Sequence, residues 1–168
     1  YGEAVAEELA RIETDLYGDT FTGRGGRLVS WKLAGFVGPG TDSVQIVRGA
    51  GELGLVLETP RGPVDLDQAM FTLRRDGVPG GTERFIFETT RASGLRVKKT
   101  YSFRPGSYLI DLLIEIAGAA DATGYRLAWK GGIPAAEGNG KHYERSAGSI
   151  VLLGKGVETE KPGSFKKV

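Results

Sequence analysis

The residue types best suited to chemistry in this chain are one histidine and a scatter of serines. His142 lies in a glycine-rich stretch, and the chain has no cysteine and no second histidine. A metal site there would therefore need carboxylates as its only other ligands. The serines, among them Ser43, Ser93, Ser107 and Ser146, lack the glycine spacing of a nucleophile elbow. We expect His142 to be an exposed loop residue, and neither a metal site nor a serine hydrolase is predicted.

Carboxylates are the second set of chemically capable residues. Pairs of them carry out glycoside hydrolysis, and Asp65, Asp67, Asp111 and Glu115 are the candidates here. Asp111 and Glu115 lie in a stretch with strand alternation, where we expect them to line a partly wetted sheet face. No catalytic, cofactor-binding or metal-binding residue is predicted, no cofactor is expected, and the chain is not expected to be an enzyme.

A glycine-rich segment, Gly23-Arg24-Gly25-Gly26, resembles a phosphate-binding loop at first reading. It lacks the lysine followed by serine or threonine that completes a P-loop, and no long helix is indicated after it. We interpret the segment as a tight turn between strands.

Two tryptophans and one lysine are the remaining candidates for binding. Trp31 and Trp129 lie among apolar residues of expected strands, so each is interpreted as a core residue rather than a platform for a sugar. Lys99 has the same parity as Val97 and Tyr101 in an alternating stretch. It should therefore point inward, and we expect it to reach water at a sheet edge or a cleft.

The elements that would position these residues are clearest in residues 95–116, which indicate two strands joined by one turn. In the first half, most apolar residues have one parity and the polar residues the other, which is typical of a strand with one wetted face. Arg104-Pro105-Gly106-Ser107 supplies the turn, and the alternation resumes from Tyr108. The sequence predicts a half-buried antiparallel hairpin.

Short apolar segments separated by turns continue along the rest of the chain. With 27 glycines and 7 prolines among 168 residues, tight turns are frequent. No amphipathic helix longer than a few turns is indicated. We expect an all-β fold, a sandwich of two stacked and mostly antiparallel sheets with little helix. Further strands are expected at 12–16, 20–22, 28–33, 44–47, 53–57, 69–73, 84–87, 125–129, 149–153 and 156–161.

Length and charge limit the domain organisation and the partners. Residues 1–9 are expected to form a linker or short N-terminal segment and residues 10–168 a single β-sandwich domain. The 22 basic residues balance 21 acidic ones, which argues against a nucleic-acid partner. No uncharged apolar stretch approaches the roughly 20 residues that span a bilayer. Glutamates near the start do not suit a signal peptide, and Tyr1 in place of methionine suggests a piece of a longer protein.

Several pieces of the sequence resemble, in order, those of one known family. They are residues 12–16 (IETDL), Phe21 with 24–33 (RGGRLVSWKL), 53–55 (LGL), 94–103 (GLRVKKTYSF) and 108–116 (YLIDLLIEI). On these residues the chain resembles the periplasmic domain, called P1, of the bacterial YidC membrane-protein insertase. The resemblance implies a β-supersandwich, two large antiparallel sheets stacked face to face, between the first and second membrane helices of an insertase.

The resemblance also implies a role, which we state as an expectation. The chain would be an accessory domain of an insertase that inserts and folds inner-membrane proteins, with translocon components and nascent membrane proteins as partners. It would lie, as a monomeric unit, on the periplasmic side of the bacterial inner membrane, in an integral membrane protein whose helices are outside this chain. The resemblance in fold extends to sugar-binding and aldose-epimerase domains, so a carbohydrate-binding sandwich is the alternative, although one histidine cannot supply an epimerase site. A third hypothesis for the function is a purely structural spacer.

Overall fold

Strands make up all of the regular secondary structure that the structure describes. The computed structural model describes residues 7–37, 43–78, 80–131, 149–153 and 156–160, and it contains no helix within them. The predicted all-β class is therefore confirmed. In chain order the strands are β1 (Leu9–Glu13), β2 (Tyr17–Thr22), β3 (Arg27–Val37), β4 (Ser43–Glu52), β5 (Gly54–Glu58), β6 (Val64–Asp65), β7 (Thr72–Gly77), β8 (Glu83–Thr90), β9 (Arg96–Phe103), β10 (Ile110–Ala117), β11 (Gly124–Ala128), β12 (Ser149–Leu153) and β13 (Gly156–Glu160).

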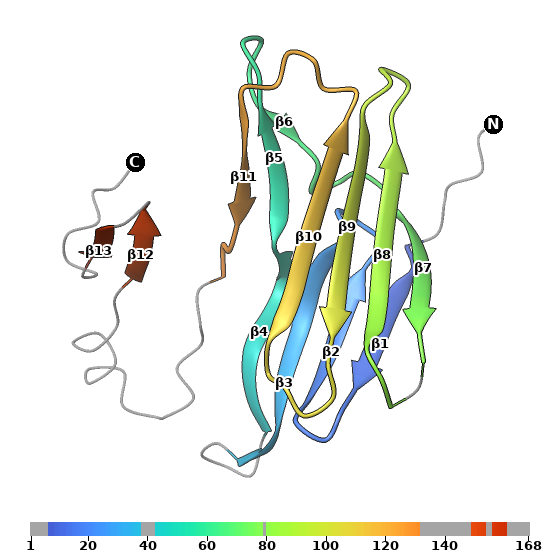
Figure 1. Ribbon diagram of the computed structural model, residues 1–168, viewed down its shortest axis with the longest axis vertical. Helices are drawn as coiled ribbons and strands as arrows, with labels where there is room; N and C mark the ends of the chain where they lie inside the picture. The colour runs from blue at the N-terminus through green and yellow to red at the C-terminus, as the bar shows by residue number, and fades with distance from the viewer. Residues whose placement is uncertain (1–6, 38–42, 79, 132–148, 154–155, 161–168) are drawn as a thin grey trace.

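Strands β1 to β11 form two stacked layers (Figure 1). The front layer is an antiparallel sheet in the order β10-β9-β8-β7. The second layer is built from the sheets β1-β2-β3-β4 and β11-β5-β6, which adjoin because β4 ends at Glu52 and β5 begins at Gly54. Leu53 between them has a φ of 64°, a left-handed conformation that residues other than glycine rarely adopt. The chain therefore kinks at the junction of the two sheets.

The core lies between the layers and is aromatic at its centre. The ring of Phe21 on β2 lies 4.6 Å from that of Tyr101 and 5.7 Å from those of Phe85 and Phe103, measured between centroids. All four rings are buried. Such pairs contribute about 0.5–1.5 kcal/mol each beyond the area that they bury. The two layers are thus joined by β2 packing against β8 and β9.

The predicted central hairpin is formed by β9 and β10. Their antiparallel register pairs Tyr101 with Leu112 and Phe103 with Ile110, and alternate residues of β9 are buried. Strand β10 starts later than the alternation suggests, because the turn extends to Leu109, whose backbone N–H donates to the hydroxyl of Ser107.

A β-bulge changes the pattern of one strand in the second layer. Simple alternation along β3 would put Val29 on the core face together with Trp31 and Leu33. The pairing of β2 with β3 shifts by one residue before Phe21, so Leu28 is the buried residue instead. Leu28, Trp31 and Leu33 consequently pack against the same core.

Strand ends differ from the predicted ones where side chains close turns. The predicted strand 12–16 ends at Glu13. The hydroxyl of Thr14 accepts hydrogen bonds from the backbone N–H groups of Leu16 and Tyr17, which turns the chain into β2. Strand β1 begins at the last residue of the segment predicted as a linker.

Two loops touch at the upper end of the sandwich, which gives a testable difference between two glycines. Gly118 has a φ of 71°, and a Cβ there would overlap the carbonyl oxygen of Gly94. Gly94 has a φ of 85°, but a Cβ on it would meet open space. We expect Gly94→Ala to lower the free energy of unfolding by about 1 kcal/mol, from backbone strain alone. Gly118→Ala should lower it by about 3 kcal/mol, because the overlap with the carbonyl oxygen of Gly94 adds to the same strain. Urea titration measures both, and equal effects would contradict the loop contact.

Candidate functional site

Lys99 lies at the centre of a polar cluster buried between the two layers. It comes from β9, and its side chain is 0% exposed. Its Nζ donates hydrogen bonds to the carbonyl oxygens of Gly25 at 2.8 Å and Leu53 at 2.7 Å, with a longer one to Gly26 at 3.4 Å. Burial lowers the pKa of Lys99 to about 8, a shift that the nearby Asp67 opposes. The carbonyl oxygens supply the acceptors that a buried ammonium group requires.

These acceptors belong to two backbone segments that are far apart in the sequence. Gly25 and Gly26 form the tight turn between β2 and β3, and both have positive φ. Leu53 is the kink between β4 and β5. Tyr101 donates its hydroxyl to the carbonyl oxygen of Gly26 at 2.8 Å. Strand β9 therefore holds both the turn and the kink, and the glycine-rich segment adopts the predicted turn.

The expectation that Lys99 reaches water at an edge or a cleft is wrong. Strand β9 is paired on both sides, with β8 and with β10, so it is not an edge. The alternation did predict that the side chain points inward. It could not show that a turn and a kink of the opposite layer would present carbonyl oxygens to the ammonium, because those groups come from distant segments.

A second set of buried charges fastens the end of β11 to the rest of the second layer. The buried carboxylate of Asp67 accepts a hydrogen bond from Lys130 Nζ at 2.7 Å, and this bond raises the pKa of Lys130. The buried carboxylate of Glu52 accepts hydrogen bonds from the backbone N–H groups of Lys130 and Gly131. The carboxylate of Asp67 lies against Gly54, so a Cβ at position 54 would force this side chain to shift. Hydrogen bonds to Glu52 and Asp67 thus fix the backbone just after β11, at Lys130 and Gly131.

Three of the four carboxylates considered for catalysis lie in separate ion pairs, Asp67 with Lys130 as described above. On the exposed face of β10, Asp111 pairs with Arg104, and Glu115 pairs with Lys98 at 2.5 Å. Asp65 is exposed and accepts a hydrogen bond from a backbone N–H of the same segment. Within the described ranges, no three histidine, cysteine or acidic side chains are grouped so that they could hold a metal.

The remaining residues weighed for chemistry fall into two groups. Ser43, Ser93 and Ser107 are described and belong to separate segments, at the start of β4 and in the loops around β9. His142 and Ser146 lie outside the described residues.

The two tryptophans differ in their surroundings. Trp31 packs against the core and lies edge-on to Tyr17, with ring centroids 6.1 Å apart. Trp129, just after β11, is 38% exposed. The core interpretation therefore holds for Trp31 and is wrong for Trp129.

Asp19 is a buried carboxylate that sequence reasoning missed. It lies between Tyr17 and Phe21 on the core face of β2 and is 2% exposed. No described protein atom donates a hydrogen bond to its carboxylate oxygens, and burial raises the pKa of Asp19 to about 7. Burial and then this carboxylate raise the pKa of Tyr17 to about 12. The alternation of Tyr17, Asp19 and Phe21 was the available signal.

One flank of the sandwich, between strands β10 and β11, is open and apolar. Each of these strands ends its sheet, so each has an edge that pairs with no other described strand. Tyr125 and Leu127 of β11 pair with the buried Leu57 and Leu55, yet they are 60% and 40% exposed. The side chains of β10 that face the core are also only partly buried. These are Ile110, Leu112, Ile114 and Ile116. We call the surface formed by these residues of β10 and β11 the open flank.

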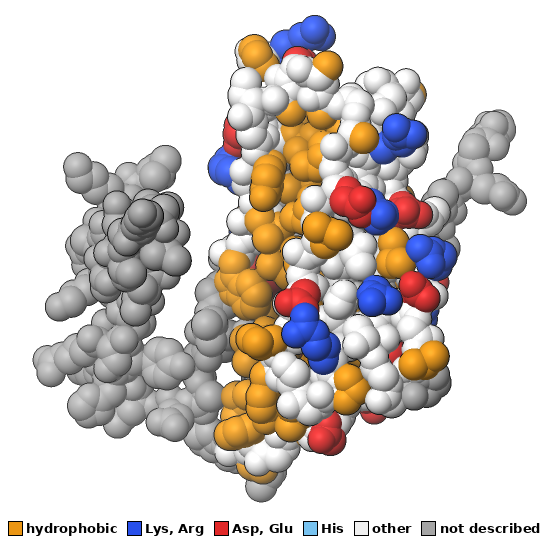
Figure 2. Space-filling view, viewed as in Figure 1, with side chains coloured by type: hydrophobic (Ala, Val, Ile, Leu, Met, Phe, Trp, Pro, Cys, Tyr) orange, Lys and Arg blue, Asp and Glu red, His pale blue; other side chains and the backbone are white. Residues whose placement is uncertain are grey.

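The open flank is visible in Figure 2 as a band of apolar side chains along the molecule. At its upper end a cavity of about 510 Å³ is lined by Leu57, Ile116 and Tyr125 together with small residues of the loop 117–124. Side chains that would be core in a closed sandwich are therefore accessible here. Unpaired backbone edges beside apolar surface suit an extended polypeptide.

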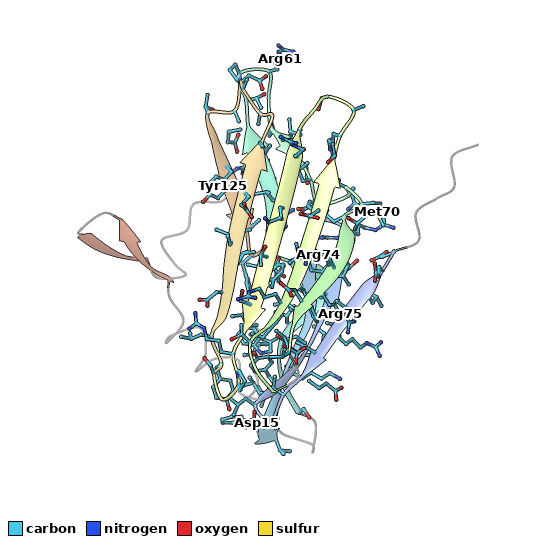
Figure 3. The ribbon with its side chains drawn as sticks, turned by 45° about the vertical axis from the view of Figure 1, so that its right-hand side comes forward. Asp15, Arg61, Met70, Arg74, Arg75 and Tyr125 are labelled. Atoms are coloured by element: carbon cyan, nitrogen blue, oxygen red, sulfur yellow. The ribbon has the colours of Figure 1, made fainter. Side chains whose placement is uncertain are left out.

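The opposite edge of the front layer has a different character. Strand β7 carries Arg74, Arg75 and Asp76, all exposed, and Figure 3 shows both arginines on this side. The carboxylate oxygen Oδ2 of Asp76 lies 4.0 Å from Nη1 of Arg74 and 3.9 Å from Nη1 of Arg84. Charged side chains on an edge strand disfavour pairing with another chain. Of the two edge strands of the front layer, β7 has three consecutive charged residues, whereas on β10 Asp111 and Glu115 alternate with apolar residues.

The fold and its surfaces define an all-β sandwich module whose distinguishing surface is an apolar edge. The chain matches the family of the YidC periplasmic domain over residues 9–156, and it belongs to that family. Searches of curated proteins and of solved structures find no match to this chain. Among the described residues there is no helix of the length and apolar character needed to cross a membrane.

Three of the pieces on which the family resemblance rests meet in the buried polar cluster. Residues 24–33 supply the turn that contains Gly25 and Gly26, residues 53–55 supply the kink, and residues 94–103 supply the lysine and the tyrosine that bind them. These pieces therefore have a structural role, which is to hold the two layers together.

Proposed function

We propose that this chain is the extracytoplasmic accessory domain of a YidC-like insertase on the periplasmic side of the bacterial inner membrane. Membership of the YidC periplasmic-domain family supports this proposal. In this role the domain performs no catalysis and holds no cofactor. It is a monomeric sandwich over residues 10–168, and it offers a surface to translocon components or to emerging membrane proteins.

The observation that carries the contact role is the open flank. An extended segment of a partner can add a strand to the free edge of β10 or β11 through backbone hydrogen bonds. Its apolar side chains would cover Tyr125 and Leu127 and enter the cavity of about 510 Å³. Backbone pairing depends little on the partner's sequence, which suits a domain that meets many emerging chains.

Leu127→Glu is expected to weaken binding of an extended apolar peptide at least about tenfold, because a strand laid over the open flank would bury the new charge. The probe is a fluorescein-labelled decapeptide of alternating leucine and serine, followed by fluorescence anisotropy. Leu127 is 40% exposed, so the substitution should leave the fold intact. Val78→Glu is the matched control, since Val78 is 66% exposed just after β7, away from the open flank.

A wild-type domain that does not bind the decapeptide, or equal weakening by both variants, would contradict the contact role. A pull-down from solubilised membranes tests the partners, and recovery of neither translocon components nor unfolded chains would count against them. The carbohydrate-binding alternative is tested by tryptophan fluorescence with a panel of mono- and oligosaccharides, because Trp129 is exposed. Unchanged fluorescence throughout would remove it.

A further inference from the structure

The last two strands form a hairpin that pairs with no other described strand. Strand β12 pairs with β13 in a two-stranded sheet of its own. An isolated two-stranded hairpin is at best marginally stable in water, and it gains stability from a third strand or a packed face. The family match extends to residue 156, which includes all of β12. Strand β12 therefore lies within the matched family unit, and β13 is the one described strand that pairs with it.

The open flank lacks a cover in the same way. Residues of β10 and β11 that pair directly with buried core residues remain accessible, as Tyr125 and Leu127 do beside Leu57 and Leu55. A sandwich closes when another strand pairs with its edge and brings apolar side chains over these positions. The hairpin could thus supply the covering strand for the open flank, and the flank could supply the third strand and apolar surface for the hairpin.

The composition of the hairpin indicates which of its strands would face the flank. Strand β12 has the sequence SIVLL, without a charged residue, whereas β13 has the sequence GVETE, with Glu158 and Glu160. An uncharged, apolar strand with a free edge promotes aggregation, and natural sheets end in strands that carry charges. With β12 placed along β10, the acidic β13 becomes the outer edge, as the charged β7 is at the other side of the same sheet.

The connection is long enough for this placement. The chain leaves the sandwich at Gly131, which is held by Glu52, and β12 begins at Ser149. The 17 residues from 132 to 148 can span up to about 55 Å when extended. Strand β10 has 8 residues and is about 27 Å long. The hairpin can therefore reach any point along β10.

We infer that the hairpin β12–β13 docks on the open flank with β12 alongside β10, so that this chain carries its own occupant for the apolar edge. An extended partner segment then binds by displacing the hairpin. The docking follows from the free edges, the charge pattern and the connection length. The displacement rests, in addition, on the function proposed above.

Disulfide trapping in the full chain tests the docking, because the chain has no cysteine of its own. Leu113→Cys, on the exposed face of β10, is combined in turn with one cysteine substitution at each position from 149 to 153. Neighbouring strands bring side chains within disulfide distance. The matched control carries Arg74→Cys instead. Arg74 is matched to Leu113 because the two residues are the ends of one row of directly paired residues across the front layer. The row is Arg74, Ile86, Thr100 and Leu113.

We expect at least one pair with Leu113→Cys to form an intramolecular disulfide at least about tenfold faster than any pair with Arg74→Cys, since docking raises the local concentration beyond that of a flexible tether. Mass spectrometry of the digested monomer identifies the bond. Equal rates at both edges, or no bond at either, would overturn the docking.

The trapped pair also tests the displacement, with the decapeptide of alternating leucine and serine as the probe. The oxidised protein should bind it at least about tenfold more weakly than the same protein after reduction, because the bond holds the hairpin on the edge. Equal affinity in both states would overturn the displacement and leave the docking in place. If the reduced protein binds no peptide while the disulfide still forms, the proposed contact function fails and the docking stands.

Discussion

Lys99→Met should lower the free energy of unfolding by about 4 kcal/mol, one of the two largest effects that we expect from a single substitution in this protein. Methionine retains the volume and most of the length of the side chain but cannot donate to the carbonyl oxygens of Gly25 and Leu53. Each buried acceptor left without a donor costs about 1–3 kcal/mol. Urea-induced unfolding at pH 7, followed by circular dichroism, measures the change.

Two opposing effects decide the sign of this prediction. Burying an ammonium group is unfavourable, and replacing a buried charged pair with apolar residues is often neutral or stabilising. Here, however, the acceptors are backbone carbonyls that keep their places after the substitution, that of Gly25 buried and that of Leu53 partly buried. We therefore expect the loss of hydrogen bonds to exceed the gain from removing the charge. A neutral or stabilising Lys99→Met would show that the desolvation penalty is the larger.

The neighbouring lysine provides the matched control. Lys98 precedes Lys99 on β9 but points to the other face, where its partly exposed side chain pairs with Glu115 at 2.5 Å. Exposed ion pairs contribute little, so Lys98→Met should change the free energy of unfolding by less than about 1 kcal/mol. Tyr101→Phe removes one hydrogen bond, to Gly26, and should cost about 1 kcal/mol. A graded series of this kind would locate the effect in the buried cluster.

The fold class could be predicted because side-chain alternation is a local property. Residues 95–103 show it in the sequence, and β9 buries the same parity that the sequence indicates. The β-bulge in β3 could not be predicted in this way. It depends on how β2 pairs with β3, and a shift of one residue moved Leu28 rather than Val29 into the core.

The surfaces and buried groups were less predictable than the strands, because they depend on neighbours that are distant in the sequence. Lys99 was expected to reach water, since an inward lysine without known acceptors must do so; its acceptors come from two turns of the opposite layer. The open flank had no sequence signal, because Tyr125 and Leu127 alternate as core residues do. Only the sheet order shows that β11 is an edge.

Asp19→Asn is expected to stabilise the protein above neutral pH, by at most about 4 kcal/mol, a limit set by about 1.4 kcal/mol for each pKa unit. Burial raises the pKa of Asp19 from 3.8 to about 7. The folded state therefore holds the proton more tightly than the unfolded state does. The stability that this group contributes is fully present below pH 4 and is lost as the pH rises to about 7.

The wild-type free energy of unfolding should consequently fall between pH 4 and pH 7 by more than that of Asp19→Asn, and the two curves should diverge over this range and then run parallel. Urea titrations at intervals across pH 4–9 measure both. Asp15→Asn is the control, because Asp15 lies exposed in the turn before β2 (Figure 3) and should change the free energy of unfolding by less than about 0.5 kcal/mol. Parallel curves for wild type and Asp19→Asn from pH 4 upward would mean that the carboxylate is solvated or partnered in solution, since burial without a partner is what raises its pKa here.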